Sequence, residues 1–291
     1  MALSTSQVEV VTVLPALSPR PEDSNKGMFG EVLVIGGSRG MSGAAILCAS
    51  AALRGGAGLV RLAVPEELLV IAACSNPCYL TVPLPQDGNG RIATRAAATI
   101  LELAKAADVI AVGPGLGRGE ALTSLVIQLL AEVQKPVVLD ADGLNALEGR
   151  TEALNKHTGP LVLTPHPGEF ARLSGANVKT IQDHREEFAV PFAAEHRVIL
   201  VLKGHGTIVT DGRRIYINAT GNAGMATGGT GDVLTGLIAA LLGQGIDAFT
   251  AAQLGVHVHG LAGDLARDDL GEMSLIASDL IDYLPTALRN F

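Results

Sequence analysis

The segment Gly228-Gly-Thr-Gly-Asp232 combines a backbone suited to an anion with a carboxylate suited to proton transfer. Glycine lets backbone N–H groups approach a ligand without a Cβ in the way. The apolar run at residues 233–242 predicts a buried helix, whose first turn presents unpaired amides and the positive end of the helix dipole to a phosphate. Because the charge of Asp232 would repel a resident anion, its best use is to accept a proton from a nucleophile that faces the phosphate. The segment therefore indicates phosphoryl transfer to a hydroxyl group.

The same segment also has a purely structural interpretation. Glycine-rich turns often precede helices, and an aspartate in a first helical turn is favourable for capping and for the helix dipole alone. The chemical interpretation is favoured by the number of other glycine- or proline-rich turns that follow expected strands. These turns are Gly36-Gly-Ser-Arg-Gly-Met-Ser-Gly-Ala44, Gly113-Pro-Gly-Leu-Gly117, Asp140-Ala-Asp-Gly-Leu-Asn145, Thr164-Pro-His-Pro-Gly-Glu169 and Lys203-Gly-His-Gly-Thr207.

Short apolar runs alternate with helical patterns from Gly30 onward. We expect strands at residues 31–35, 59–64, 109–112, 136–139, 161–164, 198–202 and 207–210, and an edge strand at 213–218. We expect helices at residues 42–53, from Pro65, and at 95–106, 122–133, 178–195, 233–242, 248–267 and 274–284. Apolar strands without alternation, separated by helices, predict an α/β fold with a mainly parallel central sheet and helices on both faces. Ligands of such sheets bind at the carboxyl ends of the strands, so the turns should converge on one rim.

The sequence shows no linker, repeat or low-complexity block that would divide residues 26–291, which we expect to form one domain. Residues 1–25, rich in Ser and Pro, are expected to form an N-terminal arm. Two familiar nucleotide motifs are missing from the sequence. No Gly-x-x-x-x-Gly-Lys-Ser/Thr segment occurs, and Gly113-Pro-Gly-Leu-Gly117 lacks the third glycine of the dinucleotide motif. These gaps exclude a P-loop protein and argue against a hydride-transferring Rossmann enzyme.

The composition is that of a compact enzyme, because 48% of the 291 residues are hydrophobic and only 17% are charged. The formal net charge of −8 and the aromatic content of 3% argue against a nucleic-acid partner, but not against a small nucleotide held by backbone amides. We expect no membrane span and no secretion signal, because the sequence has neither a long apolar run nor a basic region before its N-terminal apolar part. Cys48, Cys74 and Cys78 are an odd set without metal-ligand spacing, which favours buried thiols in a reducing cytoplasm.

With these motifs the chain resembles the NAD(P)H-hydrate dehydratase family, ribokinase-like enzymes that repair hydrated nicotinamide cofactors. The resemblance runs from about Lys26 to Leu284. Its specific part is the pairing of the 164–169 motif with the 228–232 segment, because related kinases share the second but usually not the first. Many family members carry a fused epimerase domain, and the length of this chain points to the stand-alone dehydratase. The other markers are Lys26-Gly-Met-Phe-Gly30, Gly36-Gly-Ser38, Met41-Ser-Gly-Ala44, Gly113-Pro-Gly-Leu-Gly117 and Val201-Leu-Lys-Gly204.

The resemblance implies a lyase that dehydrates the S-form of hydrated NADH or NADPH, restores NAD(P)H and releases phosphate from ADP or ATP. Asp232 would take the proton from the ring hydroxyl, which attacks the terminal phosphoryl group. The ring nitrogen would then expel phosphate. The resemblance leaves open whether ADP or ATP, and hydrated NADH or NADPH, is preferred. It also implies Mg²⁺ with the nucleotide, a homotetramer and a cytoplasmic location.

The resemblance assigns site residues one by one. Ala44, Gly115, His166 and Asp232 would contact the hydrated dinucleotide. The metal ligands stay unassigned, with Asp140, Asp142 and Glu169 as candidates for contacts through water. The residues that would hold the adenine nucleotide are Lys203, Gly204, His205, Gly206, Thr207, Gly229, Thr230 and Gly231.

Several of these residues have other interpretations. Taken alone, His166 is a turn residue between two prolines and Lys203 is a surface lysine, and the motif match favours ligand contact for both. His257 and His259 are two positions apart and share no helix face, so we do not expect them to bind a metal jointly.

Two other functions compete with the dehydratase. A ribokinase-like kinase of a vitamin-precursor alcohol, of the hydroxymethylpyrimidine or hydroxyethylthiazole type, would share residues 228–232. It would leave residues 41–44 and 164–169 unexplained. A non-catalytic nucleotide sensor on the same fold would have no need of a base at Asp232.

Overall fold

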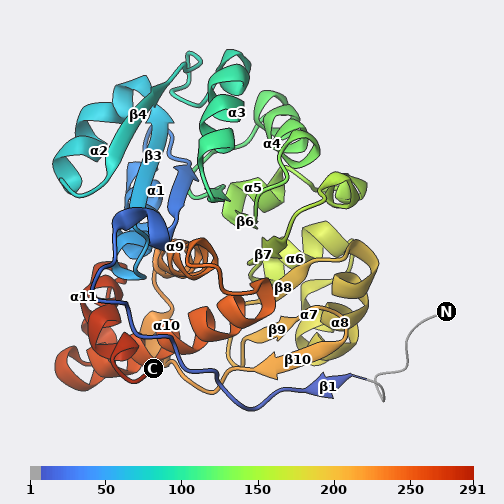
Figure 1. Cartoon of the computed structure of the whole chain (residues 1–291). Coiled ribbons are helices and arrows are strands. Elements are labelled where there is room, and N and C mark those ends of the chain that lie inside the picture. The colour runs from blue at the N-terminus through green and yellow to red at the C-terminus, as the bar shows by residue number, and fades with distance from the viewer. Residues whose placement is uncertain (1–7) are drawn as a thin grey trace.

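A ten-stranded sheet runs through the protein in the order β1-β10-β9-β8-β7-β6-β5-β2-β3-β4 (Figure 1). The structure is a computed structural model that describes residues 8–291. Strand β9 is antiparallel to both its neighbours, and every other neighbouring pair is parallel. The strands are β1 Glu9–Val10, β2 Glu31–Ile35, β3 Leu59–Pro65, β4 Leu80–Leu84, β5 Val109–Val112, β6 Val137–Leu139, β7 Leu161–Leu163, β8 Ile199–Leu202, β9 Ile208–Thr210 and β10 Arg214–Ile217. The expected mainly parallel sheet is confirmed.

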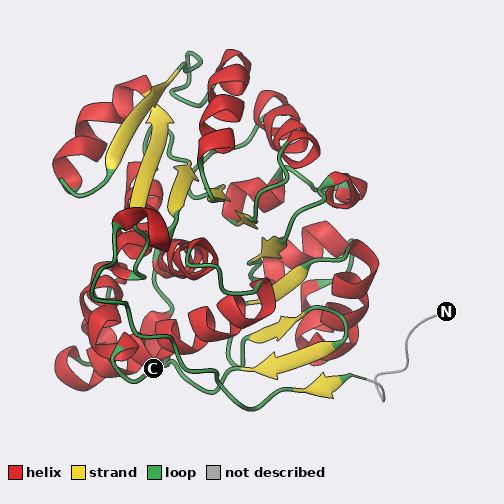
Figure 2. Cartoon of the chain, in the orientation of Figure 1, coloured by secondary structure: helices red, strands yellow, loops and turns green. Residues whose placement is uncertain are grey.

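Helices cover both faces of this sheet (Figure 2). One face packs on α1 Ser42–Arg54, α2 Leu69–Ser75, α9 Thr230–Gly243, α10 Ala248–Leu270 and α11 Ala277–Leu288. The other packs on α3 Ala97–Ala106, α4 Glu120–Glu132, α5 Ala141–Asn145, α6 Pro167–Ser174, α7 Val178–Asp183 and α8 Arg185–His196. Short 3₁₀ helices lie at Lys26–Phe29, Glu66–Leu68, Thr94–Ala96, Thr151–Lys156, Ala223–Met225 and Glu272–Ser274.

The two faces explain why the strands are apolar without alternation. In β2, Val32 and Val34 belong to the core under α1 and α9, whereas Leu33 and Ile35 belong to the core under α3. A parallel strand covered on both faces buries every side chain, so both alternating sets must be apolar. Helix α9 is likewise buried at every residue from 233 to 242, as expected for a central helix.

The structure corrects several expected elements. Residues 213–218 do not form the edge, because β1 pairs outside β10 through a bond from Glu9 N to the carbonyl of Arg213 at 2.8 Å. The expected helix at residues 178–195 is two helices that meet at His184, whose φ of −136° is not helical. Pro65 is the last residue of β3, and the helical segment expected from it begins one residue later as a 3₁₀ turn that leads into α2. Strand β4 was missed because Pro83 lies inside it, which an edge strand tolerates since it needs no donor on its outer side.

The N-terminal segment lies against the body of the protein from residue 8 onward, and residues 1–7 of the expected arm lie outside the described residues. After β1 it crosses toward α11 (Figure 1) and packs Val11, Leu14 and Leu17 against the core. The Leu17 amide donates to the carbonyl of Phe291 at 3.2 Å. The N-terminal segment is thus bonded at Leu17 to the last residue of the chain.

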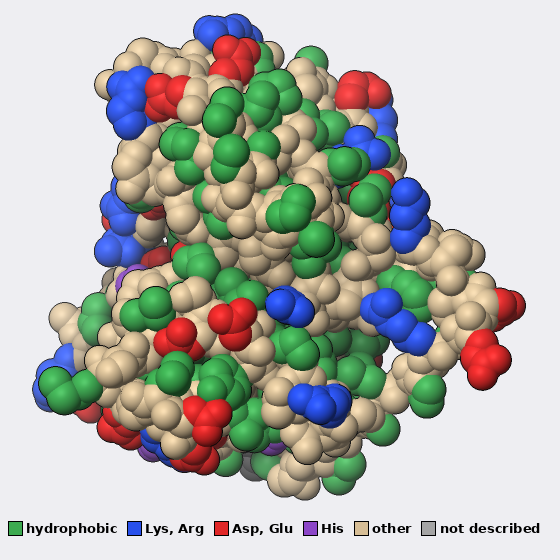
Figure 3. Space-filling view, turned by 90° about the vertical axis from the view of Figure 1, so that its left-hand side faces the viewer, with side chains coloured by type: hydrophobic (Ala, Val, Ile, Leu, Met, Phe, Trp, Pro, Cys, Tyr) green, Lys and Arg blue, Asp and Glu red, His purple; other side chains and the backbone are tan. Residues whose placement is uncertain are grey.

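The surface carries charges of both signs. On the face in Figure 3 both signs of charge are interspersed with hydrophobic side chains.

The three thiols are unpaired. The expectation of buried thiols is right for Cys48 and wrong for Cys74 and Cys78, which are exposed on α2 and in the turn after it. Across residues 8–291, none of the helices has the length and apolar character needed to span a membrane.

Candidate active site

The turns that follow the parallel strands meet at one rim of the sheet. The turn after β5 packs on the turn after β6 so closely that a side chain at Gly113 would collide with the carbonyl of Asp140. The Lys203 amide, after β8, donates to the carbonyl of Pro165, after β7, at 2.9 Å. A methyl group at Gly231 would lie 3.1 Å from Lys203 Nζ. The convergence expected from a parallel sheet therefore includes the first turn of α9.

The first turn of α9 is built to leave amides free. Gly229 precedes the helix with a φ of +97°, which glycine adopts without strain, and it brings no capping side chain. A methyl group there would lie 2.6 Å from Leu47 Cδ1 of α1. The Thr230 hydroxyl donates back to the carbonyls of Met225 and Thr227, each at 3.1 Å, and so fixes the turn. The first N–H groups of a helix have no intrahelical acceptor, so this turn can bind an anion.

Lys203 and Asp140 form a buried ion pair beside this turn. Lys203 Nζ donates to Asp140 Oδ1 at 2.9 Å, and the Thr235 hydroxyl of α9 donates to Asp140 Oδ2 at 2.7 Å. Glu169 Oε2 lies 3.9 Å from Lys203 Nζ. Burial alone would lower the pKa of Lys203, but the carboxylates of Asp140 and Glu169 raise it overall, so the ammonium stays charged. Lys203 thus lies between the carboxylates and the anion turn.

Asp232 is partly buried on the first turn of α9, among these charges. Burial is the largest cause that raises its pKa, and the negative charge of Asp140 adds to it, while Lys203 acts in the opposite direction. The net result is a pKa of about 7. A carboxyl group that exchanges its proton near neutral pH is suited to general-base catalysis.

His166 is fixed by local bonds at the start of α6. Its Nδ1 accepts from the amides of Gly168 at 3.0 Å and Glu169 at 3.3 Å, while Glu169 Oε2 accepts from the His166 amide at 2.8 Å. This reciprocal capping explains the sequence Thr164-Pro-His-Pro-Gly-Glu169. Burial lowers the pKa of His166, so the ring is neutral and carries its proton on Nε2. Its Nε2 lies 3.4 Å from Glu169 Oε1, and the ring is half exposed.

Ala44 and Gly115 lie together where the chain segments that follow β2 and β5 meet. Gly115 is buried with a φ of +63°, and a methyl group there would lie 3.0 Å from Ala44 Cβ and 2.5 Å from the carbonyl oxygen of Met41. Its carbonyl accepts from the Ser38 hydroxyl at 2.8 Å. The turns after β2 and β5 therefore form one surface with no room for a larger residue.

Gly115→Ala should destabilise the protein by about 2–4 kcal/mol, because the left-handed backbone costs about 1–2 kcal/mol and the new methyl group overlaps Met41. Urea unfolding would measure this. A Gly40→Ala control has a positive φ but nothing within 4 Å of the added methyl group, so it isolates the cost of the backbone. Equal effects of the two substitutions would show that the close packing at Gly115 is unimportant.

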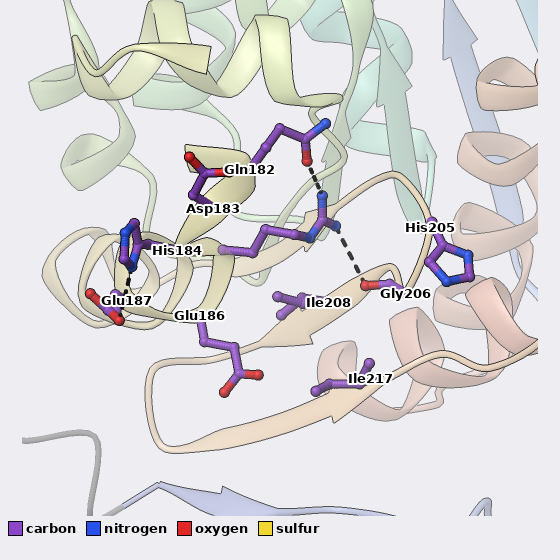
Figure 4. A pocket seen from close by; sticks show the side chains of 10 residues that line it. Gln182, Asp183, His184, Glu186, Glu187, His205, Gly206, Ile208 and Ile217 are labelled. Carbon is purple, nitrogen blue, oxygen red and sulfur yellow. Dashed lines mark hydrogen bonds and ion pairs between the residues drawn. The ribbon is translucent and has the colours of Figure 1, made fainter. Parts of the chain in front are cut away.

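The turn at residues 203–207 separates two environments. Lys203 points to the ion pair at the rim, whereas His205 and Gly206 line a pocket of about 540 Å³ on the side of α8 (Figure 4). The Thr207 hydroxyl donates to the carbonyl of Gly204 at 2.9 Å and closes the turn. Lys203, His166 and the first turn of α9 therefore lie at the rim, whereas His205 lines the pocket on the side of α8.

Sequence reasoning missed Thr235 and Arg185. Thr235 is three residues after Asp232, which places it on the same helix face, and that spacing was a usable signal. For Arg185, which bonds to the 203–207 turn, the sequence offers no comparable signal. His259 Nε2 contacts the carbonyl of Thr230 at 2.9 Å and His257 Nδ1 contacts the Tyr216 hydroxyl at 3.1 Å, so the two histidines have separate partners, as expected.

The carboxylates at the rim fit a nucleotide-bound Mg²⁺ contacted through water. Asp140 already accepts from Lys203 and Thr235, and Asp142 Oδ2 accepts from the Gly117 amide at 2.9 Å. Within residues 8–291 no cluster of three or more His, Cys, Asp or Glu is arranged to hold a metal by itself. Mg²⁺ commonly keeps several waters and binds mainly through substrate phosphates.

Comparisons with known proteins identify the family of this chain. The family model described as NAD(P)H-hydrate dehydratase matches residues 32–286. The bifunctional NAD(P)H-hydrate repair enzyme of Moorella thermoacetica is 49% identical over 94% of this chain and 52% of its own length. The ADP-dependent (S)-NAD(P)H-hydrate dehydratase of Neisseria meningitidis is 42% identical over 93% of this chain and 88% of its own length. This chain thus spans about half the length of the bifunctional relative.

Solved structures give the same result. The ADP/ATP-dependent NAD(P)H-hydrate dehydratase of Bacillus subtilis, co-crystallised with ATP and Mg²⁺, superposes with a TM-score of 0.81 at 33% identity over 94% of each chain. Ribokinase of Arabidopsis thaliana, at 14% identity and a TM-score of 0.54 over 88% of this chain and 98% of its own, shares the fold alone, which confirms the expected ribokinase-like architecture. With a family model that matches most of its length and relatives above 40% identity, this chain belongs to the NAD(P)H-hydrate dehydratase family.

Proposed function

We propose that this chain dehydrates the S-form of hydrated NADH or NADPH at the expense of ADP or ATP, and so restores NAD(P)H and releases phosphate. The observation that carries the proposal is Asp232, a carboxyl group with a pKa of about 7 on the first turn of a helix whose amides are free. The base, Asp232, and the amides that could bind the phosphate lie within one turn of the same helix. The named activities of the N. meningitidis and B. subtilis relatives support the substrate and the nucleotide.

The reaction begins with proton transfer to Asp232. The ring hydroxyl at C6 gives up its proton to the carboxylate, and its oxygen forms a bond to the terminal phosphorus of the nucleotide as the bridging P–O bond breaks. The carbon–oxygen bond of the phosphorylated hydrate then breaks. The lone pair of the ring nitrogen supplies the electrons, a proton leaves C5, and phosphate departs with the bonding pair. The products are NAD(P)H, phosphate and the shortened nucleotide.

The remaining residues position and stabilise the reacting groups. We assign to the amides around Gly229, Thr230 and Gly231 the stabilisation of the charge on the transferring phosphoryl group, where preorganised hydrogen-bond donors are most effective. The charged Lys203, held 2.9 Å from Asp140, faces the same place. We assign Ala44, Gly115 and the half-exposed His166 to contacts with the hydrated dinucleotide. The 203–207 turn holds the rest of the nucleotide.

Three finer features complete the proposal. Mg²⁺ on the nucleotide phosphates would be contacted through water by Asp140, Asp142 and Glu169, and would neutralise part of the phosphate charge. We expect a homotetramer, which light scattering would test. We also expect a cytoplasmic enzyme, which the three free cysteines support.

The test is absorbance at 340 nm after purified protein is added to hydrated NADH with Mg²⁺ and either ADP or ATP. A nucleotide-dependent rise with release of phosphate supports the dehydratase and identifies the phosphoryl donor. No rise with either nucleotide would refute it. A stable phosphorylated product from a vitamin-precursor alcohol would instead establish a kinase.

The pH profile should follow the Asp232 carboxyl group. A base works only when deprotonated, so kcat/KM should fall about tenfold per pH unit below about 7 and level off above it. Initial rates between pH 5 and 9, with thermal melting at each pH to exclude unfolding, would measure the profile. A profile that is flat between pH 5.5 and 8 would contradict the assignment of Asp232 as the base.

A further inference from the structure

The turn at residues 203–207 has little regular structure of its own. Gly204 has a φ of +133° and Gly206 a φ of +62°, and both lie in a region that side chains disfavour. Inside the turn, the Thr207 hydroxyl donates to the carbonyl of Gly204. Two glycines in five residues leave the unfolded turn many conformations, so a defined shape needs support from outside.

Arg185, the first residue of α8, supplies that support from behind the turn. Its Nη2 donates to the carbonyl of Leu202 at 2.8 Å and lies 3.3 Å from the carbonyl of Lys203 and 3.5 Å from that of Gly206. Its Nη1 donates to Gln182 Oε1 at 3.0 Å (Figure 4). One guanidinium thus reaches the backbone on both sides of the turn.

Within residues 8–291 the Arg185 guanidinium bonds to backbone carbonyls and to the Gln182 side chain, and it pairs with no carboxylate. Partial burial lowers the pKa of Arg185, yet a guanidinium stays protonated in proteins, so a partly buried cation faces neutral carbonyl groups. Its Nε is buried and has no hydrogen-bond partner among residues 8–291. The guanidinium therefore links backbone groups at the two ends of the turn.

The two cations of this region face opposite ways. Lys203 Nζ points to Asp140 at the rim, and the Arg185 guanidinium lies on the side of α8, where it lines the pocket of about 540 Å³. We propose that Arg185 is a positioning residue that holds the 203–207 turn in its nucleotide-binding conformation, and so sets affinity for ADP or ATP without touching the base. This inference rests on the proposed function, because it takes that turn as the nucleotide site.

The experiment compares Arg185→Ala and Arg185→Lys with the unaltered protein. The KM for the nucleotide should rise about 10–100-fold in Arg185→Ala, because hydrogen bonds from a charged donor are lost, and less in Arg185→Lys, whose ammonium reaches fewer carbonyls. The KM for hydrated NADH should change less than about twofold, since uniform binding of one substrate is removed. Because Arg185 lines an existing pocket, its removal should leave the protein folded, which thermal melting would verify.

Arg213→Ala, an exposed arginine between β9 and β10, is the matched control and should leave both KM values unchanged. The inference is overturned if both KM values rise alike, or if the nucleotide KM is unchanged in Arg185→Ala. Should that variant fail to fold, Arg185→Lys carries the same comparison. Calorimetric titration with ADP and with ATP measures nucleotide affinity directly, without any need for turnover. A chain that binds nucleotide but does not turn over refutes the proposed reaction while still testing Arg185, and a chain that binds neither nucleotide refutes both.

Discussion

Asp232→Asn should lower kcat by about 10²–10⁴-fold, the usual contribution of a positioned general base. The amide has nearly the shape of the carboxylate but cannot accept the proton of the ring hydroxyl. The amides of the α9 turn remain, so the Kd for ADP should change little or decrease, because a negative charge beside the phosphate is removed. Release of NADH followed at 340 nm and calorimetric titration with ADP would measure the two quantities.

The same substitution should make the protein more stable at pH 8. The folded-state pKa of Asp232 is raised from 3.8 to about 7, so its contribution to stability is fully present below pH about 4 and is lost as the pH rises to about 7. Above that, the folded protein holds a carboxylate in a place that disfavours the charge. After allowance for its partial exposure, asparagine should recover about 1–3 kcal/mol.

The two effects together distinguish the base from a structural residue. Thermal melting at pH 5 and pH 8 should show a gain for Asp232→Asn that is larger at pH 8. Asp279→Asn, on the first turn of α11, is a matched control and should not reproduce the gain, because that carboxylate accepts from the amide of Ile276 at 2.9 Å. A stable variant that keeps more than about a tenth of wild-type turnover would refute the role of Asp232.

Lys203→Met should destabilise the protein by about 3–5 kcal/mol, because Asp140, with 1% of its surface exposed, would lose the cation that it pairs with. Lys203 also lowers the pKa of Asp232, so its loss should move the acid limb of the pH profile to higher pH. Urea unfolding and the pH dependence of kcat/KM would measure these changes in any protein that remains folded.

A double-mutant cycle isolates the pair. Lys203→Met combined with Asp140→Asn removes both charges of the closest pair, so most of the lost stability should return, with a coupling of about 2–3 kcal/mol. Activity should not return, because the ammonium at the rim is still missing. Thr235→Val is the milder comparison and removes one bond of 2.7 Å to Asp140. Additive effects of Lys203→Met and Asp140→Asn would show that the ion pair contributes nothing.

The candidate site was largely readable from the sequence because its parts are local. Gly229 and Gly231 precede an apolar run, so anion turn and helix follow from neighbouring residues. The turns at residues 113–117 and 203–207 follow apolar strands, and a parallel sheet must bring their ends to one rim. Thr235 could have been found from its spacing to Asp232 along the helix. In each case the signal and the feature lie within a few residues of each other.

Other features have no local signal. Lys203 and Asp140 are 63 residues apart, and Asp140 and Thr235 are 95 apart, so their bonds depend on which strands are neighbours. Strand β1 joins the sheet edge by pairing with β10, far away in the sequence. Local propensity determines that a segment is a strand, but it does not determine which other strands that segment pairs with in the sheet.

The sequence by itself determined the alternation of strands and helices, the glycine turns at the strand ends and the position of a carboxylate beside an anion turn. Only the tertiary structure decided that this carboxylate has a pKa of about 7, since that value depends on burial and on Asp140. It alone placed Arg185 behind the 203–207 turn. The reason is physical: backbone conformation responds to adjacent residues, whereas desolvation and charge interactions depend on distances that exist only after the sheet has assembled.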